Sequence, residues 1–271
     1  MHTMNAMHPL FLLTDFGTAD PYVAQMKGVI LTLAPQARII DLSHDIRPFA
    51  ISQAGFFLWA GYDYLPQGSV VVCVVDPGVG TDRRIVLLQC DGRYVLAPDN
   101  GLTALLLSRH KGSAPVRVFE IMHGNNACSA TFHGRDIFAP LGARLINGAL
   151  PETLGTRIKT ETLVQPSWIT ARLEGNRLCT HVVHIDRFGN CLLNLMVSEW
   201  SEYLQRCAQI RVYPAGRKLH LVTTYGHLGS GELGLLAGSQ GVFEICMREE
   251  SVALELGVCP EDALSCECWK K

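Results

Sequence analysis

The sequence contains no hydrophobic run long enough to cross a lipid bilayer, since even its longest apolar runs, such as residues 70–75, are far too short. The first ten residues lack the basic start and the long apolar stretch that are typical of a signal peptide. The 23 Lys and Arg residues are balanced by 25 Asp and Glu residues, and no segment is rich in Lys and Arg, as a nucleic-acid-binding surface would require. We therefore expect a cytoplasmic protein that binds neither membranes nor nucleic acids.

The ten cysteines follow no regular spacing. Several lie inside apolar runs that are typical of strands, so in the absence of a secretory signal we interpret them as free thiols in a reducing compartment. Cys266 and Cys268 stand beside Trp269 without further metal ligands at a suitable spacing. We expect this pair to lie in a surface tail, and we expect no metal site.

A chain of 271 residues, 48% of them hydrophobic, can bury a substantial core in one large or two modest domains. The first half alternates apolar strand-like runs at residues 10–14, 38–42 and 69–75 with helical patterns. Asp20 is expected to cap the first helix, with Pro21 at its first position. The run at 69–75 is apolar on both faces, as in a buried parallel sheet. We predict an N-terminal α/β domain with a central, largely parallel sheet over residues 8–165.

The pattern of predicted secondary structure changes after about residue 151. Short β-rich segments separated by glycine-containing turns occur at residues 178–185, 192–195, 210–213, 219–223, 241–247 and 252–256. This pattern is typical of a small β-barrel or a β-sandwich. We predict a C-terminal domain of this kind over residues 172–262.

Aspartates follow two of the predicted strands, Asp15 after the first and Asp76 after the third. A single aspartate at such a position is most simply a turn residue, but two in equivalent positions favour a cleft, because ligands of open parallel sheets bind at the carboxyl ends of the strands. The glycine-rich residues 76–84 lack the Lys-Ser/Thr ending of a phosphate-binding loop. We expect their glycines to turn the backbone so that Arg83 or Arg84 returns over Asp76.

Two further polar segments are ambiguous from their pattern. His133 precedes a glycine at the start of a predicted helix, where it could serve either as a cap or in chemistry. Residues 186–190 read as a hairpin turn, although an aromatic ring and an amide there would also suit a purine.

Taken together, these segments resemble the SAM hydroxide adenosyltransferases, which are adenosine-forming S-adenosyl-L-methionine (SAM) hydrolases related to the SAM-dependent fluorinase and chlorinase. The resemblance runs from about residue 10 to residue 256, in order and with matching gaps. The matching segments are Thr14-Asp15-Phe16-Gly17, Val75-Asp76-Pro77-Gly78-Val79-Gly80, Arg83-Arg84, Pro98-Asp99-Asn100-Gly101, Phe132-His133-Gly134-Arg135-Asp136 and Asp186-Arg187-Phe188-Gly189-Asn190.

The resemblance implies an α/β domain followed by a β-barrel, in a homotrimer that binds SAM between the N-terminal domain of one subunit and the C-terminal domain of its neighbour. It implies hydrolysis of SAM to adenosine and L-methionine, with no metal and no cofactor. The family's catalytic residues fall on Asp76, Arg83 and His133. The implied substrate contacts are Asp15 and Phe49 near the ribose, Asp20, Asp186 and Ser239 near the methionine moiety, and Phe188, Asn190 and Tyr225 near adenine.

The chemistry requires an activated water, because the sulfonium of SAM already activates C5′ toward displacement. Arg83 could stabilise hydroxide, and either Asp76 or His133 could accept the proton. An ion pair between Arg83 and Asp76 would make Asp76 the weaker base and His133 the better candidate.

Two other functions compete with hydrolysis. One is a SAM-dependent halogenase, which is disfavoured because Asp76 would repel a halide and because the fluorinase carries hydroxyl residues at the places of Val79 and Gly134. The other is a protein that binds SAM or adenosine without catalysis. The sequence departs from the family at residues 247–251, which could narrow the adenine pocket or point outward from a barrel strand, and at Gln240, where the fluorinase has an arginine.

Overall fold

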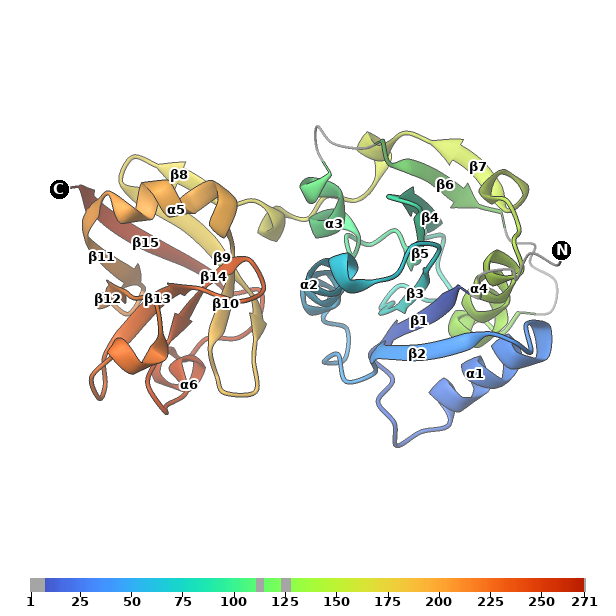
Figure 1. Ribbon diagram of the computed structural model, residues 1–271, viewed down its shortest axis with the longest axis horizontal. Coiled ribbons are helices and arrows are strands. Elements are labelled where there is room, and N and C mark those ends of the chain that lie inside the picture. The colour runs from blue at the N-terminus through green and yellow to red at the C-terminus, as the bar shows by residue number, and fades with distance from the viewer. Residues whose placement is uncertain (1–7, 111–114, 123–127, 271) are drawn as a thin grey trace, which may run out of the picture. The chain divides into compact units, whose positions relative to one another are not determined.

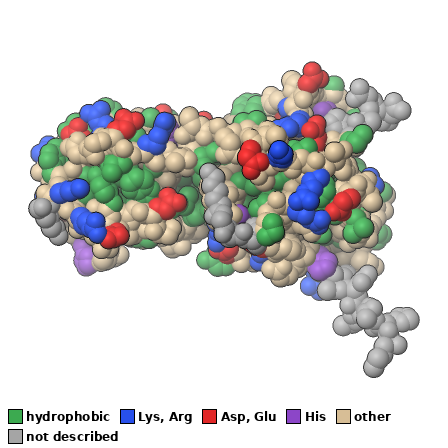
Figure 2. Space-filling model, turned by 90° about the horizontal axis from the view of Figure 1, so that it is seen from above, with side chains coloured by type: hydrophobic (Ala, Val, Ile, Leu, Met, Phe, Trp, Pro, Cys, Tyr) green, Lys and Arg blue, Asp and Glu red, His purple; other side chains and the backbone are tan. Residues whose placement is uncertain are grey.

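The computed structural model describes residues 8–110, 115–122 and 128–270, so most of the N-terminal segment considered above lies outside the described residues. The chain divides into two compact units, Met1–Gln165 and Pro166–Lys271 (Figure 1). Within the described part, no helix combines the length and the apolar character that a bilayer span requires. On the face drawn in Figure 2, basic and acidic side chains are interspersed.

The first unit is built on a seven-stranded sheet with the strand order β2-β1-β3-β5-β4-β6-β7. Its strands are β1 (Pro9–Thr14), β2 (Arg38–Ser43), β3 (Val70–Val74), β4 (Ile85–Cys90), β5 (Arg93–Pro98), β6 (Arg117–Ile121) and β7 (Gly155–Ile158). Strands β2, β1, β3 and β5 pair in parallel, and β4, β6 and β7 add antiparallel pairings at one edge. The predicted α/β unit with a largely parallel sheet is confirmed.

Helices cover both faces of this sheet, which explains why its strands are apolar on both sides. Leu10 and Leu12 of β1 share one core with Met26 of helix α1 (Tyr22–Leu33) and with helix α4 (Ala139–Ile146). Phe11 and Leu13 share the other core with helices α2 (Ile51–Gly61) and α3 (Ala104–Arg109). Successive residues of one strand therefore pack against helices on opposite faces of the sheet. Burial of each leucine side chain contributes about 1.5–3 kcal/mol to the stability of the fold.

The expectation that Asp20 caps the first helix was wrong. Helix α1 has Pro21 at its N-cap and no side-chain capping hydrogen bond. The Gln25 backbone N–H donates to the Pro21 carbonyl oxygen at 2.9 Å, which places the first helical turn one residue later than the sequence pattern indicated.

The second unit is a closed β-barrel, as predicted. Its strands are β8 (Arg172–Glu174), β9 (Arg177–Ile185), β10 (Cys191–Met196), β11 (Cys207–Tyr213), β12 (Arg217–Leu221), β13 (Leu233–Ala237), β14 (Val242–Cys246) and β15 (Ala263–Lys270). The order β10-β14-β13-β12-β11-β15-β9 closes through a β9–β10 pairing, and β8 extends from β9. Helices α5 (Val197–Gln205) and α6 (Val252–Leu256) complete the unit, so the prediction that residues 252–256 form a β-rich segment was wrong.

The interpretation of Cys266 and Cys268 as part of a surface tail was also wrong. Both lie on β15, which pairs with β9 and β11, and both are buried in the barrel core. Burial raises the pKa of each of these thiols to about 12, so they remain protonated apolar groups in the core.

Candidate active site

Parallel pairing brings the two predicted aspartates to the same edge of the sheet. Thr14 of β1 is in register with Val74 of β3, so Asp15 and Asp76 leave their strands side by side. An Asp15 carboxylate oxygen accepts a hydrogen bond of 2.9 Å from the Phe49 backbone N–H. Burial raises the pKa of Asp15, and the nearby charge of Asp76 raises it further, while its backbone hydrogen bonds lower it.

The glycine-rich loop after β3 is a series of turns that returns Arg83 to Asp76. The Val79 and Thr81 N–H groups donate to the Asp76 and Gly78 carbonyl oxygens. Gly80 has φ +79°, and a Cβ there would lie 2.5 Å from the Ala130 carbonyl oxygen. Only glycine allows this close approach between the loop of Arg83 and the segment that precedes His133.

Asp76, Arg83 and His133 form one hydrogen-bonded cluster. Arg83 Nε donates to the two Asp76 carboxylate oxygens at 2.9 and 2.8 Å, and Arg83 Nη2 also donates to Asp76. The Nη2 atom lies 2.8 Å from His133 Nδ1. A guanidinium has no acceptor, so His133 Nδ1 accepts this hydrogen bond and the ring hydrogen of neutral His133 is on Nε2.

The cluster is nearly closed to solvent, with the side chains of Asp76 and Arg83 only 4% and 10% exposed. Arg83 Nη1 is buried and has no hydrogen-bond partner among the described residues. Arg83 thus holds a buried carboxylate and orients an imidazole, and it keeps one donor for a further anionic or polar oxygen. The neighbouring Arg84 pairs instead with Asp99, which answers the question of which arginine returns over Asp76.

A cavity of about 740 Å³ adjoins the cluster, within the usual size range of small-molecule sites. Asp15, Phe49, Asp76 and His133 line it, as do aromatic residues that the sequence interpretation did not single out. The Phe132 ring contacts those of Phe16 and Tyr22, with centroids 5.8 and 5.2 Å away. Other lining residues are Gln25, Pro48, Val74, Val79, Ser129, Thr131, Gly134 and Arg135.

Phe49 and Asp20 differ in their relation to this cavity. Phe49 is 69% exposed and has φ +68°, a conformation unusual for an aromatic residue and one that coincides with its N–H bond to Asp15. Asp20 is exposed just before α1 and is not among the residues that line the cavity.

The Asp186–Asn190 segment of the second unit is a turn organised by the Asp186 side chain. One Asp186 oxygen accepts hydrogen bonds of 2.9 Å from the Phe188 and Asn190 N–H groups, and the other accepts one from Asn190 Nδ2. The turn leaves the Phe188 ring 78% exposed, while Asn190 is buried. The segment is therefore a turn that also displays an aromatic face, so the two interpretations of its sequence are compatible.

Glu244 of β14 is a buried acid that the sequence interpretation did not single out. Its carboxylate accepts a hydrogen bond from the Tyr225 hydroxyl. Burial raises the pKa of Glu244, the hydrogen bond from Tyr225 lowers it, and the charge of Asp186 raises it. Burial, followed by the contact with Glu244, raises the pKa of Tyr225 as well. Tyr225, Glu244 and Asp186 are thus electrostatic neighbours on the barrel.

The remaining barrel residues of interest lie in turns. Ser239 and Gln240 are exposed between β13 and β14, where Gln240 Nε2 donates to Ser239 Oγ at 3.5 Å. Residues 248–250 form an exposed bend between β14 and α6 and do not belong to a barrel strand. The following Ser251 packs against Gly189, where an added Cβ would lie 2.0 Å from Ser251 Oγ.

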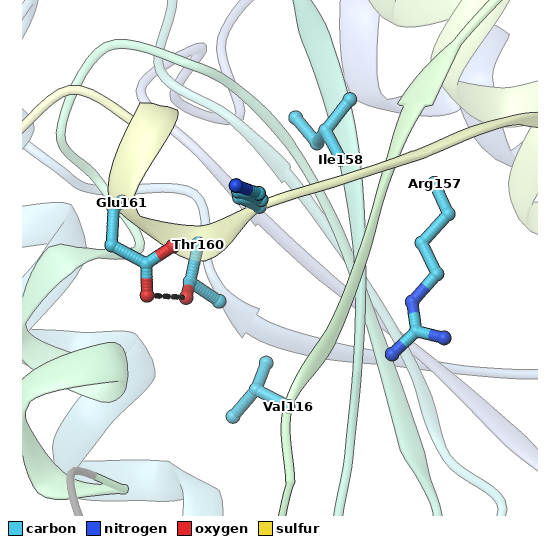
Figure 3. A pocket seen from close by; sticks show the side chains of 6 residues that line it. Val116, Arg157, Ile158, Thr160 and Glu161 are labelled. Atoms are coloured by element: carbon cyan, nitrogen blue, oxygen red, sulfur yellow. Dashed lines mark hydrogen bonds between the residues drawn. The ribbon is translucent and has the colours of Figure 1, made fainter.

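A second hollow, of about 510 Å³, lies beside β6 and β7 of the first unit (Figure 3). Its lining includes Arg157 and Glu161, but Glu161 turns to the adjacent Thr160 hydroxyl. Because its charged groups do not converge, the cavity at Asp76 is the better candidate for an active site.

Comparison with known proteins agrees with this geometry. Family profiles described as the SAM hydroxide adenosyltransferase N-terminal and C-terminal domains match residues 10–155 and 180–265. The (R)-S-adenosyl-L-methionine hydrolase of Thermus thermophilus is 36% identical over 265 residues, covering 93% of this chain and 96% of that protein. A fluorinase of Nocardia brasiliensis is more distant, at 25% identity over 72% of this chain and 74% of its own.

A solved structure of an uncharacterized conserved protein from Thermotoga maritima superposes with a TM-score of 0.81 at 29% identity, covering 95% of this chain and 99% of that chain. The two profiles fall on the two units described above, and the matched regions include the aspartates at the sheet edge and the turn at residues 186–190. The chain belongs to the SAM hydroxide adenosyltransferase family.

Proposed function

We propose that this chain hydrolyses SAM to adenosine and L-methionine, by attack of water on C5′. The observation that carries this function is the buried cluster of Asp76, Arg83 and His133 beside a cavity of substrate size. The relative from Thermus thermophilus bears the name of this activity, and similarity over nearly the whole length of both chains supports the same reaction here.

Arg83 stabilises the nucleophile in this mechanism. SAM has a good leaving group in its sulfonium, but water is a weak nucleophile until its proton is removed or its oxygen is stabilised. The Nη1 donor of Arg83 is buried and unused among the described residues, so it can bind the developing hydroxide. The cavity then holds water and C5′ in line, which adds the effect of proximity.

The sequence left both Asp76 and His133 open as the proton acceptor, with His133 the better candidate if Asp76 pairs with Arg83, whereas the hydrogen-bond pattern favours Asp76. His133 Nδ1 is occupied by Arg83, and its Nε2 carries the ring hydrogen in the neutral form. Each Asp76 oxygen has lone pairs beyond those that Arg83 engages. In this arrangement His133 positions Arg83 through Nδ1 and can donate its Nε2 hydrogen to the oxygen of the attacking water. The proton of that water moves to Asp76.

The proposed substrate contacts rest on this placement for Asp15 and Phe49, and on the family resemblance for the remaining residues. Asp15 can accept hydrogen bonds from both ribose hydroxyls, with Phe49 beside it. On the barrel, the exposed ring of Phe188 and the ring of Tyr225 suit stacking on adenine, and Asn190 suits hydrogen bonding to it. Asp20, Asp186 and Ser239 are assigned to the methionine moiety.

We further propose a homotrimer in which the cavity of one subunit is completed by the barrel residues of a neighbour. The substrate-binding residues are divided between the two units, and the family resemblance assigns them to different subunits. Sedimentation of the purified protein should give a trimer, whereas a monomer with full activity would overturn this arrangement.

The test of function is chromatography of a reaction with SAM. Adenosine and methionine should form in equal amounts, a chelator should leave the rate unchanged because no cofactor takes part, and Asp76→Ala and His133→Ala should each lose most of the turnover. Undiminished activity in both variants would refute the assigned roles. Tight SAM binding without any product would instead indicate a non-catalytic binding protein.

Halogenation is the weaker alternative. The Asp76 carboxylate lines the cavity and would repel a halide. A Cβ on Gly134 would lie only 3.2–3.3 Å from side-chain atoms of Phe132, Met26 and Phe16, so a hydroxyl-bearing side chain there would be tightly packed and would require these neighbours to shift. Incubation with SAM and chloride or fluoride should therefore give no halogenated adenosine.

A further inference from the structure

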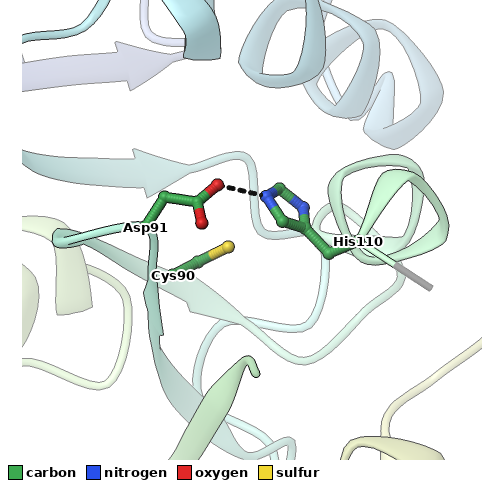
Figure 4. A group of neighbouring side chains, drawn as sticks. All are labelled: Cys90, Asp91 and His110. Atoms are coloured by element: carbon green, nitrogen blue, oxygen red, sulfur yellow. Dashed lines mark hydrogen bonds and ion pairs between the residues drawn. The ribbon is translucent and has the colours of Figure 1, made fainter. Parts of the chain in front are cut away.

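Three side chains with metal-ligating atoms converge where β4 turns into β5 (Figure 4). Cys90 ends β4, Asp91 begins the turn, and His110 follows the last residue of α3. The Cys90 thiol, an Asp91 carboxylate oxygen and a His110 ring nitrogen all lie within 4.8 Å of one another. They supply one sulfur, one oxygen and one nitrogen ligand atom.

His110 is oriented as metal-binding histidines are. Its Nδ1 lies 2.9 Å from the Leu106 carbonyl oxygen, which can only accept, so Nδ1 carries a hydrogen. Its Nε2 lies 2.7 Å from an Asp91 oxygen, on the side of the ring that faces the cluster. A backbone carbonyl that fixes the far nitrogen is the common outer-shell partner of a histidine that binds metal through the other nitrogen.

The other two ligands are also held in place. The Cys90 carbonyl oxygen accepts a hydrogen bond of 2.7 Å from the Tyr62 hydroxyl, and Cys90 itself is only 2% exposed. Asp91 and Gly92 have φ +46° and +69°, as in a tight two-residue hairpin turn. The Asp91 side chain is 37% exposed, so the carboxylate end of the cluster is open to solvent.

We propose that Cys90, Asp91 and His110 bind one Zn²⁺ ion, with a water molecule in the fourth position. A mixed sulfur, nitrogen and carboxylate set suits Zn²⁺ and does not suit Mg²⁺ or Ca²⁺, which prefer oxygen. On binding, the Cys90 thiol and His110 Nε2 each release a proton to solvent, and the metal replaces the contact between His110 Nε2 and the Asp91 carboxylate.

The site lies at the opposite edge of the sheet from Asp76. Strand β5 is parallel to β3, and the Cys90–Asp91 turn precedes β5 whereas Asp76 follows β3. A five-residue strand spans roughly 16 Å. The metal would therefore join the end of α3 to the β4–β5 hairpin without touching the catalytic cluster, and its role is to stabilise this part of the first unit.

The experiment is titration of the full chain, after chelator treatment and dialysis, with Zn²⁺ alone. We expect one ion per chain by calorimetry and by elemental analysis, and a rise in Tm of about 5 °C at a hundredfold excess over Kd. Cys90→Ser, Asp91→Asn and His110→Gln should each weaken binding at least tenfold, while SAM hydrolysis stays unchanged.

The matched control is Cys259→Ser, because Cys259 is an exposed thiol and should bind a stray ion as well as any other cysteine. It should leave the affinity unchanged. Co²⁺ in place of Zn²⁺ should give a thiolate charge-transfer band that is absent in Cys90→Ser. If Cys90→Ser fails to fold, the weakened affinity of Asp91→Asn, a substitution at an exposed turn, tests the site instead. Failure of the wild-type chain to bind Zn²⁺, or equal binding by the three variants, would overturn the site.

Discussion

Replacing Arg83 by lysine tests whether the guanidinium fork, and not positive charge alone, organises the site. Arg83 engages both oxygens of Asp76 and reaches His133 through the same planar group. A lysine ammonium keeps the charge but cannot hold this bidentate geometry and contact His133 as well. Two hydrogen bonds to charged groups would be lost, at about 1.5–3 kcal/mol each.

Together these two hydrogen bonds amount to about 3–6 kcal/mol, and the contact that lysine keeps with Asp76 places the expected loss of transition-state stabilisation at the lower end, about 3–4 kcal/mol. At 1.36 kcal/mol for each factor of ten, kcat/KM should fall roughly 10²- to 10³-fold. The assay is adenosine release measured by chromatography over a range of SAM concentrations, with circular dichroism to confirm folding.

Arg84→Lys is the matched control, since this neighbour pairs with Asp99 outside the cluster. It should retain activity within a few fold. Activity of Arg83→Lys within threefold of wild type would refute the reasoning, because charge alone would then suffice.

Three further substitutions test the surrounding geometry. Burial and the charge of Asp76 raise the pKa of Asp15. As the pH is lowered, wild-type kcat/KM for SAM should therefore begin to fall at a pH closer to neutrality than an ordinary aspartate would cause. Asp15→Asn should have low activity, and its pH profile should lack this acidic decline. Gly80→Ala should lower kcat about 10- to 100-fold in steady-state assays, because the added Cβ would collide with the Ala130 carbonyl oxygen. The control is Gly148→Ala, which has a similar φ but no atom near the added Cβ, and it should retain wild-type turnover. Gly134→Ser should lower Tm by a few degrees in a thermal melt and yield no halogenated adenosine by mass spectrometry, and formation of that product would contradict the packing found there.

The framework of both units could be predicted because it depends on local pattern. Strands that are buried on both faces require continuous apolar runs, and such runs are visible in the sequence. The side-by-side position of Asp15 and Asp76 followed from parallel strand order, and the return of an arginine over Asp76 followed from the glycines of the intervening loop, although the loop pattern did not decide between Arg83 and Arg84.

Features set by contacts distant in sequence could not be read in the same way. The burial of Cys266 and Cys268 depends on the pairing of β15 with two strands far back in the chain. Glu244 is one acidic residue within the apolar strand β14, and the Tyr225 hydroxyl that binds its carboxylate comes from a segment 19 residues earlier in the chain. Phe16, Tyr22 and Phe132 come together from three segments, so no single motif marks their cluster.

The most direct test of the proposed reaction is a single turnover in water enriched in ¹⁸O. Attack of water on C5′ places the solvent oxygen in the 5′-hydroxyl of adenosine, so mass spectrometry should find one ¹⁸O atom in adenosine and none in methionine. Adenosine without the label, or label in methionine, would contradict the mechanism built on Asp76, Arg83 and His133.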